Sequence, residues 1–125
     1  MNKAKLFERI VAIDIETSSQ GKVLDIGCYT YNDYIVFSDW KQFFEYLLKM
    51  KGAIRIIAHN GFGFDFITFN QWFLKHRNDY DIADDDVIYL SSESLLIAMI
   101  IYHNGAQYTF LDTMRYFPAQ SLQKL

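Results

Sequence analysis

The 125-residue chain has little of several features that mark particular classes of protein. A single cysteine, Cys28, allows no internal disulfide, and no charged and apolar leader opens the chain, so we expect an intracellular protein, whether cytoplasmic, viral, phage or organellar. The longest apolar run, residues 95–101, is far shorter than the roughly 20 residues that span a bilayer, so we expect no membrane segment. The formal net charge of -3 argues against a wholly basic surface, so contacts with nucleic acid must be local or mediated by metal ions.

Residues that break regular structure are also scarce. One proline and six glycines stand in a chain that is 51% hydrophobic and 22% charged, which is typical of an ordered globular protein. We find no internal repeat, linker or low-complexity tract, and the length suits a single core. We therefore predict one domain over residues 1–125.

The pattern of apolar and turn-forming residues predicts an α/β domain with a mixed sheet and flanking helices. Helices are expected from residue 38 or 39 to 50 and over 64–76, and residues 119–125 resemble the first turn of another. Asn104-Gly105 predicts a hairpin turn, and 78–86 an acidic loop exposed to solvent. The expected strands cover residues 7–15, 23–30, 34–37, 54–58, 87–90, 95–102 and 108–116.

Two carboxylates stand at the end of the first predicted strand. Because side chains at i and i+2 of a strand share a face, Asp14 and Glu16 would lie side by side. Two like charges this close repel each other unless a cation lies between them, and Mg²⁺ and Mn²⁺ prefer such oxygen ligands. A strand that simply ends in solvent is the alternative.

A third carboxylate follows a later strand. Residues 58–66 predict a buried strand, a glycine-containing turn and a helix that Asp65 opens. The glycines permit the close backbone approach that a substrate strand would need. The alternative is that Asp65 only complements the dipole of the helix that it begins.

Together these segments resemble the first two exonuclease motifs of family B DNA polymerases, which have the ribonuclease-H-like DEDD proofreading fold. The matching residues are Asp-Ile-Glu-Thr at 14–17 and Asn60-x-x-x-Phe64-Asp65, about 50 residues apart. Residues 108–113, followed by Ser121-Leu122-x-x-Leu125, are similar to a strand-then-helix segment of the protein-primed, organellar and viral branch. The resemblance covers nearly the whole chain and implies a ribonuclease-H-like mixed sheet.

The resemblance also implies a metal site. Asp14, Glu16 and Asp65 would bind two Mg²⁺ or Mn²⁺ ions about 4 Å apart, one activating the attacking water and the other stabilising the leaving 3′ oxygen. The family's fourth carboxylate lies in a Tyr-x-x-x-Asp motif on a helix downstream of this segment, so we expect a fold truncated at its C-terminal end. Asp112 falls on a predicted strand, where it is either a buried, hydrogen-bonded structural residue or a substitute ligand.

Residues around the second motif would contact the substrate. The resemblance implies that Asn60 and Phe64 seat the 3′-terminal nucleotide, that Phe62 stacks or wedges against it, and that Thr17 contacts its backbone. With eleven phenylalanines in one small domain, core packing is the alternative for Phe62 and Phe64. His59 would either orient a phosphate or simply pack at the strand end.

We therefore predict the N-terminal portion of the 3′-5′ exonuclease domain of a family B DNA polymerase of the protein-primed type, acting on the 3′ end of single-stranded DNA. Its partners would be DNA and either the remainder of the polymerase or a terminal protein. Two alternatives remain: a stand-alone DEDD nuclease that trims DNA or RNA ends, and a non-catalytic ribonuclease-H-like module that binds nucleic acid. Metal-dependent cleavage separates them.

Overall fold

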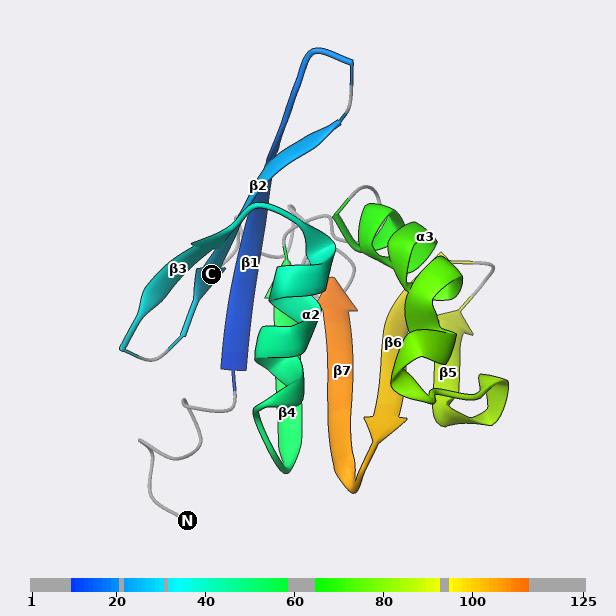
Figure 1. The fold of residues 1–125 in the computed structure, drawn as a ribbon. Helices are drawn as coiled ribbons and strands as arrows, with labels where there is room; N and C mark the ends of the chain where they lie inside the picture. The colour runs from blue at the N-terminus through cyan, green and yellow to red at the C-terminus, as the bar shows by residue number, and fades with distance from the viewer. Residues whose placement is uncertain (1–9, 21, 31, 59–64, 93–94, 113–125) are drawn as a thin grey trace, which may run out of the picture.

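A computed structural model describes residues 10–20, 22–30, 32–58, 65–92 and 95–112, which form one sheet with two helices packed on it (Figure 1). The described part of the sheet has seven strands in the order β3-β2-β1-β4-β7-β6-β5. The strands are β1 (Ile10–Thr17), β2 (Val23–Tyr29), β3 (Tyr34–Phe37), β4 (Ala53–Ala58), β5 (Val87–Ser92), β6 (Leu95–His103) and β7 (Ala106–Asp112).

The sheet mixes parallel and antiparallel pairs. β1, β2 and β3 form an antiparallel meander, and β4 lies parallel to β1. β7 lies parallel to β4, and β6 and β5 then continue the sheet in antiparallel pairs. This arrangement confirms the predicted mixed α/β class and is compatible with a ribonuclease-H-like fold. It also directs β1, β4 and β7 toward the same edge of the sheet.

Both helices cover one face of the sheet, α2 (Trp40–Leu48) beside α3 (Phe66–His76) (Figure 1). Asp39 begins α2 as predicted, because its side chain accepts a hydrogen bond of 2.8 Å from the backbone N–H of Gln42. The core between helices and sheet is largely aromatic. Phe69 lies at its centre, with ring contacts to both helices and to Phe110 on β7.

Some boundaries differ from the sequence predictions. β1 extends to Thr17, so both carboxylates of the first motif lie within a strand. The acidic loop contains two 3₁₀ turns, Arg77–Tyr80 and Asp84–Asp86, and an ion pair between Arg77 and Asp84 ties them together. The hairpin at Asn104-Gly105 is confirmed by positive φ angles of 48° and 82°. The predicted start of the first strand, the end of the last one and the helix at 119–125 lie outside the described residues.

Within the part of the chain that the structure describes, no helix combines the length and apolarity needed to cross a membrane.

The position of Phe69 predicts a large effect of truncation. Phe69→Ala removes a fully buried ring from the aromatic core and should lower the free energy of unfolding by about 3–5 kcal/mol. Ile67→Ala, on the same helix but 43% exposed, is the matched control and should change it by less than about 1 kcal/mol. Urea unfolding of the three proteins measures this, and similar losses in both variants would contradict the packing.

Candidate carboxylate site

The parallel strands bring distant acidic residues to one edge of the sheet. Ala12 pairs with Ile57 between β1 and β4, and Ala58 pairs with Asp112 between β4 and β7. Asp14 therefore lies only one residue beyond the level of Asp112, two strands away. With neighbouring strands roughly 4.8 Å apart, this separation is about 10 Å across the sheet.

Asp14 and Glu16 project from the face of the sheet that α2 and α3 do not cover. They alternate along β1 with Val11 and Ile13, which are buried against the helices, and both are exposed. The two carboxylates thus share a face, as the spacing predicted.

The first motif also borders a hollow that the sequence analysis did not foresee. The hollow has a volume of about 120 Å³. Its lining residues come from β1, β2 and β3: Asp14, Glu16, Asp25, Gly27, Tyr29, Tyr34 and Val36. Tyr34 lies across Gly27, because a Cβ built on that glycine would be 3.1 Å from the Tyr34 hydroxyl and 3.3 Å from the backbone oxygen of Asp14. These neighbours follow from strand register, which a local sequence pattern does not reveal.

Asp112 has a different environment from the first two carboxylates. It ends β7 on the same face as Tyr108 and Phe110, toward the helices, and it is fully buried. The burial of Asp112 agrees with the first of the two alternatives that the sequence left open, a buried structural residue. The negative charge of Asp112 still acts on the site, because it contributes to the raised pKa of Asp65.

Asp65 lies between these groups, at the start of α3. Its side chain makes no capping hydrogen bond, so the observed role differs from that of an ordinary N-cap. Partial burial, together with the smaller effect of the negative charges of Asp14 and Asp112, raises the pKa of Asp65 to about 6. The structure thus places Asp65 within electrostatic range of both, although it belongs to another element.

The donor chemistry of this edge suits a hard divalent cation. Carboxylate oxygens are the ligands that Mg²⁺ and Mn²⁺ prefer, and a cation would relieve the repulsion that Asp65 experiences. Among the residues that the structure describes, however, no three His, Cys, Asp or Glu side chains form a ready-made metal cluster. The carboxylates are the right type of ligand for Mg²⁺ or Mn²⁺, but metal binding would have to bring them closer together.

Most of the residues predicted to contact substrate lie in a part of the chain that the structure does not describe. His59, Asn60, Phe62 and Phe64 lie outside the described residues. Thr17 is the last residue of β1, partly buried and paired with Val23 beside an irregularity in the ladder. The structure thus describes one of the predicted substrate-binding residues, at the same edge as the carboxylates.

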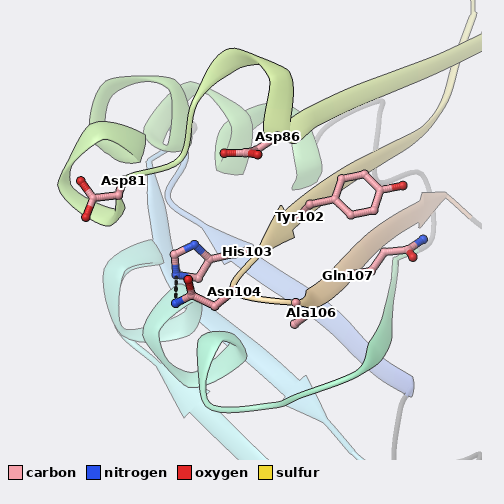
Figure 2. Close-up of a pocket in the computed structure, with 8 residues that line it drawn as sticks. Asp81, Asp86, Tyr102, His103, Asn104, Ala106 and Gln107 are labelled. Carbon is pink, nitrogen blue, oxygen red and sulfur yellow. Dashed lines mark hydrogen bonds between the residues drawn. The ribbon is translucent and has the colours of Figure 1, made fainter.

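A second hollow lies at the opposite end of β7 (Figure 2). It has a volume of about 420 Å³ and is lined by the hairpin around His103 and by Asp81 and Asp86 from the acidic loop. Asp86 is engaged, because its carboxylate accepts a hydrogen bond of 2.9 Å from the backbone N–H of Ala83. His103 is hydrogen-bonded to Asn104 at 3.2 Å. These polar groups stabilise the loop and the hairpin, which favours a structural role for this end of the sheet.

Comparisons with known proteins support the fold. No family model matches the chain, and no curated protein is similar enough in sequence to count as a relative. Among solved structures, the chain is similar to phi29 DNA polymerase complexed with primer-template DNA, with a TM-score of 0.66 and 16% sequence identity. The match covers 92% of this chain and 23% of the polymerase chain. The chain thus spans about a quarter of that polymerase, and a likeness at this identity establishes a shared fold.

The raised pKa of Asp65 predicts a pH-dependent stability. The folded chain binds the proton more tightly than the unfolded chain, whose aspartate has the ordinary pKa of 3.8. The free energy of unfolding should therefore fall as the pH rises from about 4 to about 6. Asp65→Asn removes this titration, so the variant should be more stable than the wild type above pH 6, and the difference should shrink below pH 4. Urea unfolding across this range measures it, and a difference independent of pH would contradict the placement of Asp65.

Proposed function

We propose that the chain is part of the 3′-5′ exonuclease domain of a family B DNA polymerase and acts on single-stranded DNA 3′ ends with Mg²⁺ or Mn²⁺. The observation that carries this proposal is the environment of Asp65. Its carboxylate makes no capping hydrogen bond, and its pKa is raised by partial burial and, to a smaller extent, by the charges of Asp14 and Asp112. A polar group in such an environment is costly for stability, so a function for it is the simplest explanation.

Each carboxylate has a distinct part in this proposal. Asp14 and Glu16 would hold cations from the open face of β1, and Asp65 would bind them from the start of α3. Such ions, when bound, would supply an activated water and stabilisation of the leaving 3′ oxygen. Asp65 is mostly ionised at neutral pH, because its pKa is about 6, and it is therefore ready to act as a ligand.

Asp112 acts on the site through its charge and is poorly placed to supply a ligand oxygen. It is fully buried and on the face that the helices cover, whereas Asp14 and Glu16 are on the other face. Two divalent ions need about four negative ligands, so three accessible carboxylates leave one ion dependent on substrate phosphate and water. We therefore expect slow hydrolysis by the 125-residue chain.

The substrate contacts complete the proposal. Thr17, at the end of β1, would contact the backbone of the 3′-terminal nucleotide. Asn60, Phe62 and Phe64 would seat that nucleotide, and His59 would orient a phosphate. The likeness to a quarter of a DNA polymerase chain supports DNA as the substrate and the rest of a polymerase as the natural partner, with a terminal protein as the other candidate.

A non-catalytic module that binds nucleic acid is the second candidate. The observation in its favour is that no three acidic or metal-binding side chains among the described residues form a preassembled cluster. Such a module would bind DNA without cleaving it. A stand-alone nuclease would instead cleave without any further polypeptide.

Cleavage of a 3′-labelled single-stranded oligonucleotide in Mn²⁺ tests the proposal. The wild-type chain should release mononucleotides from the 3′ end. Asp14→Ala and Asp65→Asn should lower this rate by at least about 100-fold, since even residues that only orient a metal ligand contribute tens-fold. Asp85→Asn, an exposed residue of the acidic loop, is the matched control and should leave the rate unchanged.

The outcomes separate the candidates. Release that needs the metal and is lost with Asp14 supports the exonuclease. Binding without any release would favour the non-catalytic module. Brisk release by the wild type would show that the site is complete in this chain and that Asp112 acts as a ligand after all.

A further inference from the structure

A groove on the helix-covered side of the molecule has the composition of a nucleic-acid contact surface. It has a volume of about 500 Å³ and lies between the start of α2, the outer side of α3 and the start of β2. The residues that matter here are Lys22, Trp40, Gln71, Trp72, Lys75 and His76. They come from three separate segments, and none belongs to the carboxylate site.

The groove is lined by two lysines and one aspartate in a chain whose net charge is -3. Lys22 and Lys75 are both exposed, and neither forms an ion pair within the described residues. The acidic residue in the lining, Asp39, uses its carboxylate to cap α2. The groove therefore presents two unpaired cations to a polyanion.

Aromatic rings form its wall and floor. Trp72 is partly buried and lies against Phe44 and Phe69 of the core, with ring centroids 5.8 Å and 6.0 Å away. His76 stacks on Trp72 at 4.9 Å and an interplanar angle of 26°. Trp40 is only 6% exposed and packs on Phe69 beneath them. A rigid aromatic surface of this kind suits stacking of a base, whatever its identity.

The groove follows α3 from its first turn, next to Asp65, toward its end. α3 begins at the residue after Asp65, and Thr68, Gln71 and Lys75 follow from it along the groove. At a rise of 1.5 Å per residue, Lys75 lies about 15 Å along the helix from Asp65, which is the length of a few nucleotides. The other wall, at Val23, pairs directly with Thr17 at the end of β1.

We propose that this groove binds the single-stranded DNA that leads to the carboxylate site, with a base stacked on the His76–Trp72 pair and phosphates on Lys22 and Lys75. The choice of single-stranded DNA rests on the proposed function. The binding itself needs only the unpaired lysines, the aromatic wall and their place along α3. It requires no metal ion.

Tryptophan fluorescence reports on this groove selectively, because the chain has two tryptophans and both line it. Titration with an oligothymidylate of about 10 nucleotides in EDTA should quench the emission. For two phosphate contacts the logarithm of the association constant should fall with the logarithm of the salt concentration with a slope of about -1.4. Lys22→Glu and Lys75→Glu should each weaken binding by about tenfold and reduce the slope.

Matched variants keep the outcomes distinct. Lys49→Glu makes the same charge change at an exposed residue that ends α2 away from the groove, and it should bind like the wild type. Asp14→Ala should lose nuclease activity but keep the quenching. A wild-type chain that shows the quenching and releases no mononucleotides would overturn the proposed function and leave the assignment of the groove intact. Absence of quenching, equal loss in Lys49→Glu and Lys75→Glu, or equal quenching by inorganic polyphosphate would overturn the assignment of the groove to DNA.

Discussion

The parallel pairing of β4 with β1 on one side and with β7 on the other brings three strand ends to one edge of the sheet. Everything at the candidate site depends on this pairing. It places Asp14 and Asp112 near the start of α3, where burial and the charges of both residues raise the pKa of Asp65. The carboxylates of Asp14, Asp65 and Asp112 therefore repel one another at this edge of the sheet. A bound cation would be the simplest way to relieve that repulsion.

The two faces of the sheet differ in what they carry. One face is sealed by α2 and α3 over an aromatic core, which includes the phenylalanines of α3 and Phe110. The other face carries Asp14 and Glu16, which are exposed to solvent. α3 links the two, because its beginning follows Asp65 and its middle places Trp72 in the groove that we assign to DNA. One helix thus serves packing, the carboxylate site and the proposed groove.

Local patterns in the sequence were sufficient for most of the fold and for the principal acidic residues. The i, i+2 spacing of Asp14 and Glu16 and the strand and helix on either side of the glycine-containing segment before Asp65 are local features. The structure confirms β1, β4 and α3. Strand register was not predictable in this way. Register decides that Asp112 is on the helix side, and it brings Tyr34 over Gly27 beside Asp14. The groove was missed for a related reason, since Lys22, Trp40 and Trp72 are far apart in the chain.

The central claim is that Asp14, Glu16 and Asp65 together bind a divalent ion. Paramagnetic broadening of backbone amide signals by substoichiometric Mn²⁺ tests it most directly, because the ion erases the signals of residues that lie close to it. The account predicts that the amides of these three residues, contributed by β1 and by the start of α3, broaden first and recover when Mg²⁺ is added in excess. Broadening centred on the acidic loop around Asp85, or on β1 without Asp65, would contradict it.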